Sequence, residues 1–277
     1  MPHSEFKLLS PDATFAGEIW EPSIPAKAVV CLVHGHGEYT GRYHYVAQLL
    51  NEAGIAVISF DNFGHGKTPG KRGVIPSYDA IMRALASLLD EAAQRWPAKP
   101  RFLYGHSMGG NFVVNHALRL NPSIVGVIAT SPWFKLSIKP PAAQVFLARL
   151  MMKIAPGFAQ STRLNPAFIS RDPAEVDRYR NDPLIHDKMS ANLFFSTYNA
   201  GLWALEHAGK FHLPLLVHHG TGDQITSWEA SEAFAQTAGG GDVTLKLWKG
   251  LYHETQYEPE KDTVIGFTRD WILARIK

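Results

Sequence analysis

The chain has 277 residues, of which 45% are hydrophobic, 19% charged and 11% aromatic, a composition that excludes disordered, collagen-like and coiled-coil proteins. This length accommodates one large domain or a core domain with an insertion. The 27 Lys and Arg residues nearly balance the 25 Asp and Glu residues, and the formal charge is +2. Because no run of basic residues occurs, a nucleic-acid partner is not expected.

The cysteine count and the amino-terminal segment narrow the class of protein further. Cys31 is the only cysteine, which excludes an internal disulfide and a cysteine-rich zinc site. Residues 1–7 lack the apolar core of a signal peptide, and no stretch approaches the roughly 18 apolar residues of a membrane span. We therefore expect a soluble, cytoplasmic protein.

Strands and helices are predicted to alternate along most of the chain. Two short antiparallel strands come first, at 6–9 and 15–20, separated by the turn residues 10–12. Continuous apolar runs then indicate strands that are buried on both faces of a parallel sheet. These strands are expected at 28–33, 55–60, 101–104, 124–130, 213–218 and 243–248, with helices at 43–53, 77–96, 109–120, 227–237 and about 260–276. The order predicts a doubly wound, mostly parallel α/β sheet, with ligand sites at the carboxyl ends of its strands.

The interval 133–209 interrupts this alternation. It is rich in proline and contains no clear buried strand. Since an irregular loop of this length is uncommon inside a compact domain, the interval is predicted to be an inserted, mostly helical cap. The core would then consist of residues 1–132 and 210–277.

The segment Gly105-His106-Ser107-Met108-Gly109 fits the pattern G-x-S-x-G. It follows a predicted strand and opens a predicted helix, which is the setting that exposes a nucleophilic serine on a strained turn. The glycines leave room for the close backbone approach of that turn. Ser107 is therefore the predicted nucleophile.

A serine nucleophile needs a histidine base that is oriented by a carboxylate, in the chain order serine, acid, histidine for this type of sheet. Asp223 follows the strand at 213–218, at the edge where the acid belongs. Of the 13 histidines, His253 is the only one after Asp223, and it follows the strand at 243–248. Asp242 and Asp182 are conceivable substitutes for the acid, but Asp242 precedes its strand and Asp182 lies inside the cap.

The oxyanion of the reaction requires backbone N–H donors. One is expected from Met108, the residue after the nucleophile, and the other from His36 in the loop after the strand at 28–33. The imidazole rings of His34 and His36 are expected only to pack or to form local hydrogen bonds. No metal or organic cofactor is implied.

These motifs resemble the α/β-hydrolase fold, and more narrowly its monoacylglycerol lipase and lysophospholipase branch. By this resemblance, Glu38 and Arg42 would shape the loop or the alcohol side of the pocket, or form a salt bridge that only holds the loop. Asp61 and His65 are expected to be structural, and Gln256 stands where some members have a second pocket histidine. The resemblance rests on residues 34–43 (HGHGEYTGRY), 61–66 (DNFGHG), 105–110 (GHSMGG) and 252–254 (YHE).

The cap carries the strongest indication of the substrate. Residues 142–155 are nearly apolar, so they are expected to pack on the core, to line an acyl channel or to touch a membrane surface. The candidate contacts are Val145, Phe146, Leu150 and Met151.

The resulting prediction is a serine hydrolase that cleaves monoacylglycerols or related mono-acyl lipids through an acyl-enzyme. A lysophospholipase, a short-chain carboxylesterase and, less favoured, a peptidase acting on small amino-acid derivatives would use the same residues. A ligand receptor with slow turnover is the alternative from another class. The sequence does not predict an oligomeric state.

Overall fold

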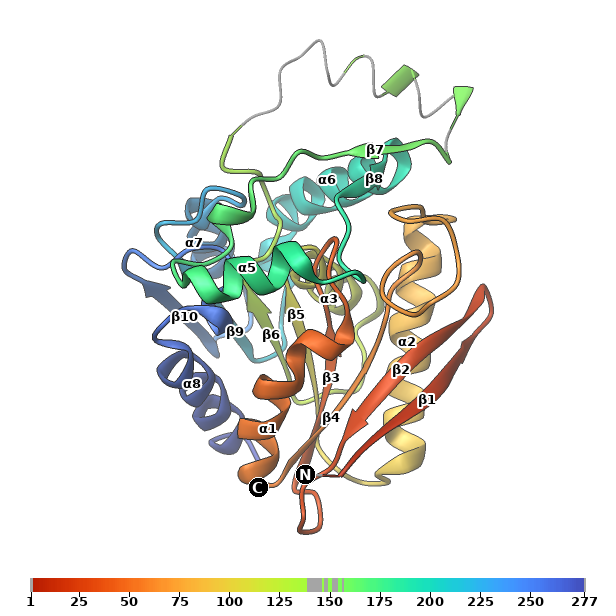
Figure 1. Ribbon diagram of the computed structural model, residues 1–277. Helices are drawn as coiled ribbons and strands as arrows, with labels where there is room; N and C mark the ends of the chain where they lie inside the picture. Colours follow the sequence, from red (N-terminus) through yellow and green to blue (C-terminus); the bar gives the residue numbers. More distant parts are fainter. Residues whose placement is uncertain (1, 139–145, 147–148, 151–153, 156, 277) are drawn as a thin grey trace.

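The computed structural model describes residues 2–138, 146, 149–150, 154–155 and 157–276. Eight strands form one sheet in the order β1-β2-β4-β3-β5-β6-β9-β10 (Figure 1). The first two strands are antiparallel to their neighbours, and the remaining strands are parallel to one another. Their bounds are β1 His3–Ser10, β2 Ala13–Trp20, β3 Ala28–Val33, β4 Ile55–Phe60, β5 Arg101–His106, β6 Gly126–Thr130, β9 Leu215–Gly220 and β10 Val243–Trp248. This is the predicted α/β-hydrolase sheet, and the prediction of the fold class is confirmed.

Helices cover both faces of the sheet. The helices α1 (His44–Glu52) and α8 (Lys261–Leu273) pack on one face, and α2 (Tyr78–Arg95), α3 (Met108–Leu120) and α7 (Trp228–Thr237) pack on the other. Since both faces are covered, every residue of β3, β4, β6 and β9 is buried. This burial explains the continuous apolar runs in the sequence.

The helix α2 illustrates how sequence signals set an element. The Ser77 hydroxyl accepts a hydrogen bond from the N–H of Ala80 at 3.1 Å, which caps the helix at its amino end. Ile81, Leu85 and Leu88 lie on one buried face at helical spacing. The predicted helix at 77–96 is confirmed within one residue at each end.

The strands β1 and β9 were expected at 6–9 and 213–218, and they span His3–Ser10 and Leu215–Gly220. Local structure differs from the prediction in two further places. The helix expected at 43–53 is preceded by a 3-10 turn, η1 (Thr40–Tyr43). The cap contains two short strands, β7 (Ala159–Ser161) and β8 (Lys188–Ser190), which pair antiparallel and were not expected. Three-residue strands are too short to produce a readable alternation of apolar and polar residues.

The described residues of the interval 133–209, which is predicted to form the cap, lie at one end of the sheet, and both chain termini lie at the other end (Figure 1). The described helical elements of this interval are η2 (Pro166–Phe168), α5 (Pro173–Asn181), α6 (Ala191–Glu206) and η3 (Ala208–Lys210). The helix predicted at 142–155 falls mostly outside the described residues, including Val145 and Met151. No helix in the described part of the chain is both long and apolar enough to cross a membrane.

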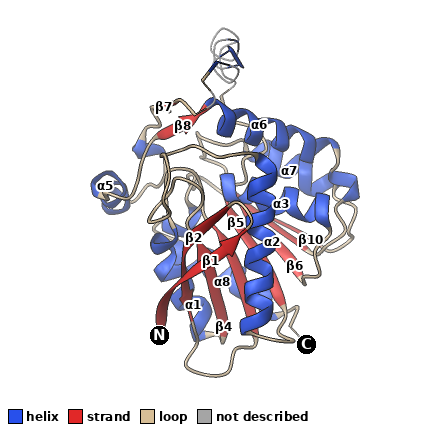
Figure 2. Cartoon of the chain, turned by 90° about the vertical axis from the view of Figure 1, so that its right-hand side faces the viewer, coloured by secondary structure: helices blue, strands red, loops and turns tan. Residues whose placement is uncertain are grey.

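The helix α6 packs closely on the core helix α3 (Figure 2). Asn111 of α3 donates a hydrogen bond to the carbonyl of Thr197, and Asn115 donates one to the carbonyl of Ala200, at 3.0 and 3.2 Å. A Cβ at Gly201 would lie 2.4 Å from the carbonyl oxygen of Phe134. Glycine is therefore required for this close contact, which fixes α6 above the sheet.

The first turn of α3 is equally close to β3. A Cβ added at Gly109 would lie 2.1 Å from the carbonyl oxygen of Val33. We expect Gly109→Ala to lower the free energy of unfolding by about 2 kcal/mol or more, because neither backbone can move without disturbing the sheet. Denaturant unfolding followed by circular dichroism measures this effect.

Gly266→Ala is the matched control for that substitution. Gly266 also lies in a helix, α8, but the nearest atom to an added Cβ is Nη2 of Arg269 at 3.8 Å. This variant should gain about 0.5–1 kcal/mol from the higher helix propensity of alanine. Equal destabilisation of the two variants would contradict the assignment of the effect to the α3–β3 contact.

Candidate active site

Ser107 lies on a sharp turn between β5 and α3. Its backbone has φ 53° and ψ −114°, a conformation that non-glycine residues rarely adopt, and its N–H donates a hydrogen bond to the carbonyl of Thr130. A Cβ at Gly105 would lie 2.2 Å from the carbonyl oxygen of Gly109, so the turn closes only because glycines flank the serine. The turn directs the Ser107 side chain to the carboxyl edge of the sheet.

The loop after β10 brings His253 to this serine. Nε2 of His253 lies 2.9 Å from Oγ of Ser107, and Nδ1 lies 2.6 Å from Oδ2 of Asp223. Because an ionised carboxylate can only accept, Nδ1 carries the proton and Nε2 accepts a hydrogen bond from the Ser107 hydroxyl. Burial alone would lower the pKa of His253, but the charge of Asp223 and its hydrogen bond outweigh burial and raise it.

Asp223 lies in the loop after β9, and its carboxylate is buried. Oδ1 accepts the backbone N–H groups of Ile225 and Thr226 at 2.7 and 3.1 Å. Oδ2 faces His253 and also Nε2 of His219, which lies 2.8 Å away. Burial alone would raise the pKa of Asp223, but the charge of His253 and the hydrogen bonds from both imidazoles outweigh burial and lower it. Asp223 is therefore ionised at neutral pH.

The loop after β3 lies directly beside the serine. A Cβ at Gly35 would lie 3.3 Å from Cβ of Ser107, and His36 is the next residue of this loop. Met108 is the first residue of α3, so its N–H has no partner within the helix. The two amides that were predicted as oxyanion donors thus belong to residues beside Ser107.

A buried ion cluster connects this loop to the loop that carries His253. Nη1 of Arg42 lies 2.9 Å from Oε2 of Glu38, and Arg42 makes a bidentate pair with Glu254 at 2.7 Å for both bonds. Glu38 also accepts the N–H of Gly35 at 2.6 Å, and the Tyr257 hydroxyl donates to the carbonyl of Arg42. The structure therefore pairs Glu38 with Arg42 and adds Glu254, a residue to which the sequence analysis gave no role.

The segment after β4 is hydrogen-bonded to the loop after β3. Asp61 accepts the backbone N–H groups of Thr40 and Lys67 at 2.8 and 2.7 Å. The ring of His34 accepts the N–H of Asn62 at 2.9 Å, and the ring of His65 donates to the carbonyl of Phe63. These contacts are local and structural, as expected for Asp61, His65 and His34.

The ring of His36 packs edge-on against the rings of His65 and His186, with centroids 5.5 and 5.6 Å apart, as expected. Both of its ring nitrogens are buried and have no hydrogen-bond partner among the described residues. Burial, with a smaller contribution from His186 and His34, lowers the pKa of His36 to about 3. The imidazole is therefore neutral at physiological pH and keeps one free donor and one free acceptor.

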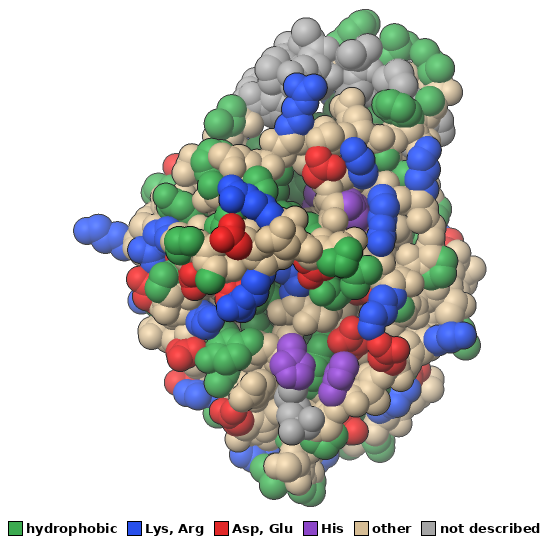
Figure 3. All heavy atoms as spheres, in the orientation of Figure 1, with side chains coloured by type: hydrophobic (Ala, Val, Ile, Leu, Met, Phe, Trp, Pro, Cys, Tyr) green, Lys and Arg blue, Asp and Glu red, His purple; other side chains and the backbone are tan. Residues whose placement is uncertain are grey.

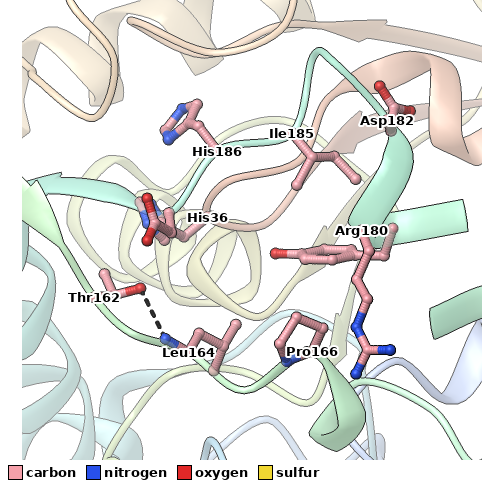
Figure 4. Close-up of a pocket in the computed structure, with 10 residues that line it drawn as sticks. His36, Thr162, Leu164, Pro166, Arg180, Asp182, Ile185 and His186 are labelled. Carbon is pink, nitrogen blue, oxygen red and sulfur yellow. Dashed lines mark hydrogen bonds between the residues drawn. The ribbon is translucent and has the colours of Figure 1, made fainter. Parts of the chain in front are cut away.

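His36 lines a cavity of about 320 Å³ between the loop after β3 and the cap. Figure 4 shows His36 and His186 on one side of it, with Arg180 and Asp182 on the α5 side. Burial, followed by the charge of Arg72, lowers the pKa of His186 to about 4, so this ring is neutral as well. The cavity therefore combines neutral imidazoles with the charged side chains of Arg180, Asp182 and Asp187, next to the loop that approaches Ser107.

The remaining candidates of the sequence analysis lie apart from Ser107. Phe146 and Leu150 are exposed, at 72% and 43%. Asp242 is paired with Arg275, and Asp182 accepts a hydrogen bond from the hydroxyl of Tyr39. Within the described residues, no group of three or more acidic, histidine or cysteine side chains could hold a metal ion.

His219 was missed because the search for a base considered only histidines after Asp223. The signal that could have found it is its place four residues before the acid, at the end of β9. Glu254 could have been found from its place next to His253, but nothing in the sequence indicates that Arg42 is its partner.

Comparison with known proteins agrees with this geometry. Residues 24–260 match the family model described as Serine aminopeptidase, S33. A monoacylglycerol lipase of Mycolicibacterium smegmatis is 32% identical over 260 residues, which cover 94% of this chain and 92% of that protein. The crystal structure of a Paleococcus ferrophilus monoacylglycerol lipase superposes with a TM-score of 0.86 at 36% identity, covering 93% of this chain and 98% of that one.

A longer relative shares only its hydrolase part. An uncharacterized abhydrolase domain-containing protein of Dictyostelium discoideum is 33% identical over 272 residues, which cover 98% of this chain but 29% of that protein. Together with the matched family model, these relatives show that the chain is an ester hydrolase of the α/β-hydrolase fold and belongs to the serine hydrolase family that includes the monoacylglycerol lipases.

Proposed function

We propose that the protein hydrolyses monoacylglycerols to a fatty acid and glycerol, with Ser107 as nucleophile, His253 as general base and Asp223 as the group that orients the base. Ser107 Oγ attacks the ester carbonyl while Nε2 of His253 takes the hydroxyl proton. The same proton then passes to the leaving alcohol, and an acyl-enzyme remains. Water, activated by His253, releases the fatty acid and restores the serine. The hydrogen-bonded chain from Ser107 through His253 to Asp223 is the observation that carries this proposal.

The backbone amides of His36 and Met108 are the proposed oxyanion donors. The attack of Ser107 places negative charge on the former carbonyl oxygen, and each donor that meets it contributes about 3–4 kcal/mol to transition-state stabilisation. The ion cluster of Glu38, Arg42 and Glu254 supports this role, because it holds the loop that carries His36.

The polar cavity supports a leaving group with several hydroxyls. The rings of His36 and His186 line this cavity, and both are neutral. A peptide substrate with a free amino terminus would need a free carboxylate. Glu38 and Glu254 are paired with Arg42, Asp182 accepts from Tyr39, and Asp187 accepts from Ser161 and pairs with Lys188. An ester of a polyol is therefore favoured over a small amino-acid derivative.

We also propose that residues 133–209 form the cap and that its apolar side chains contact a membrane surface, with the protein itself in the cytoplasm. Figure 3 shows hydrophobic side chains gathered at the end of the molecule that carries the cap. Large exposed hydrophobic residues are concentrated there, and such concentration is typical of interaction surfaces. They are Ile138, Phe146, Leu150, Ile154 and Phe158.

The substrate class is tested with a panel of esters that share one acyl chain. We expect a higher kcat/KM for the monoacylglycerol than for the corresponding lysophospholipid or ethyl ester, and no cleavage of amino-acid anilides. Ser107→Ala should lower kcat by about 10⁴-fold or more, and a fluorophosphonate probe should label only Ser107. Release of fatty acid, measured by mass spectrometry, is the readout.

Each alternative function has its own outcome in this panel. A higher kcat/KM for the lysophospholipid, or cleavage of the anilides, would replace the monoacylglycerol assignment. Tight binding with a single turnover would indicate a receptor. An unchanged rate in Ser107→Ala would remove the nucleophile assignment.

The pH dependence tests the role of His253. The base must be neutral to accept the Ser107 proton, so activity is lost as pH falls through its pKa. Since Asp223 raises that pKa above the ordinary value of 6.5, the acid limb of kcat/KM should have its midpoint above 6.5. Asp223→Asn should move the midpoint to lower pH and decrease kcat by about 10⁴-fold. A midpoint that stays in place in this variant would contradict the pairing.

Membrane contact is tested with Phe146→Ser and Leu150→Ser. Because both side chains are exposed and apolar, their loss should weaken vesicle binding and slow hydrolysis of monoacylglycerol embedded in vesicles. Hydrolysis of a soluble short-chain ester should not change. Ile24→Ser is the control, since Ile24 is 50% exposed but lies between β2 and β3, before the amino end of β3 and so at the opposite end of the sheet from residues 133–209. An equal effect of all three substitutions would refute a membrane-facing cap.

A further inference from the structure

The carboxylate of Asp223 is shared between two imidazoles. Oδ2 lies 2.6 Å from Nδ1 of His253 and 2.8 Å from Nε2 of His219. His219 occupies the fifth position of β9, and both its side chain and that of Asp223 are fully buried. The hydrolytic mechanism described above assigns no role to this second histidine.

The hydrogen bonds of His219 define its tautomer. Because the carboxylate of Asp223 can only accept, Nε2 of His219 carries the proton. Nδ1 then accepts a hydrogen bond from the hydroxyl of Ser231 in α7, at 2.8 Å. His219 thus accepts a hydrogen bond from Ser231 at Nδ1 and donates one to Asp223 from Nε2.

We propose that His219 is a positioning residue of the triad, whose Nε2–H holds the Asp223 carboxylate in the orientation that faces His253. This inference rests on the proposed function of Ser107, His253 and Asp223. The remaining oxygen of Asp223 is held by the backbone N–H groups of Ile225 and Thr226. With donors at both oxygens, the carboxylate cannot rotate away from His253 without losing a hydrogen bond to a buried charge.

Because Oδ2 of Asp223 accepts hydrogen bonds from both imidazoles, its negative charge is divided between His253 and His219. A donor from His219 draws electron density away from the bond to His253, so the carboxylate stabilises the imidazolium less than an undivided one would. The other titratable or charged groups that face His253 are His106, Glu38 and Glu254, and none of them contacts His219. Removal of His219 therefore leaves those contributions unchanged, and Asp223 then stabilises the imidazolium of His253 more strongly, which raises the pKa of His253.

The chain supplies a matched control in the adjacent residue. His218 lies on the same strand and is fully buried, but its ring nitrogens lie near the hydroxyls of Thr255 and Thr268, at 3.4 and 3.3 Å. Replacing either histidine by leucine removes a buried imidazole from β9. Only His219→Leu also removes a donor to Asp223.

The experiment compares the pH profiles of the full-length variants on a soluble short-chain ester. In His219→Leu, kcat should fall about tenfold or more, with little change in KM, because a hydrogen bond to a charged group contributes about that factor. The midpoint of the acid limb should move to higher pH by about half a unit or more. His219→Gln, whose amide can donate at a similar reach, should restore most of the rate and the position of the limb. His218→Leu should decrease thermal stability without moving the limb.

Nuclear magnetic resonance of the unaltered protein tests the same inference without any substitution. Histidine ¹H–¹⁵N correlations should show His219 protonated at Nε2 and not at Nδ1 at neutral pH. The positioning role would be overturned by the opposite tautomer of His219. It would also be overturned if the acid limb of His219→Leu stayed in place or moved to lower pH, or if His218→Leu shifted the limb equally. If the unaltered protein hydrolyses no ester, the proposed function fails, and the tautomer still decides whether His219 donates to Asp223.

Discussion

One buried carboxylate organises the carboxyl edge of this sheet. Ionised Asp223 is costly away from water unless every oxygen is hydrogen-bonded, and the structure supplies donors from two backbone amides, two imidazoles and the hydroxyl of Thr226. The same hydrogen bonds fix the tautomer of His253, which leaves Nε2 free to accept the hydroxyl proton of Ser107. The requirement to stabilise a buried charge and the requirement to activate a serine are therefore met by one set of contacts.

The buried guanidinium of Arg42 is a second charge that holds the loops of the site. Arg42 is enclosed by Glu38 and Glu254, so the loop after β3 and the loop after β10 are joined through one guanidinium. The first loop carries the proposed oxyanion donor His36, and the second carries His253. Movement of either loop would separate buried opposite charges, which is strongly unfavourable. Arg42 thus couples the position of the base to the position of the oxyanion donor.

The cap combines tight packing with an accessible polar cavity. The helix α6 is fixed on α3 by Asn111 and Asn115, while the ring of His186 packs edge-on against His36 at the side of the cavity. Neutral imidazoles and charged side chains line this cavity, and large apolar side chains of residues 133–209 are exposed to solvent. This division suits a molecule with a polar and an apolar end.

The sequence alone determined the order of the strands and most helix limits, and it led to Ser107, Asp223 and His253 as candidates. Each of these depends on local features: continuous apolar runs, the glycines beside Ser107, and the order of Asp223 and His253 after their strands. Only the tertiary structure decided that Glu254 pairs with Arg42 and that His219 shares Asp223. Neither pairing can be read from the sequence, since the first joins residues 212 positions apart, and the place of His219 four residues before Asp223 does not show that its ring reaches the carboxylate. Contacts between loops depend on how distant strand ends meet at one edge, and that arrangement is set by packing of the whole sheet.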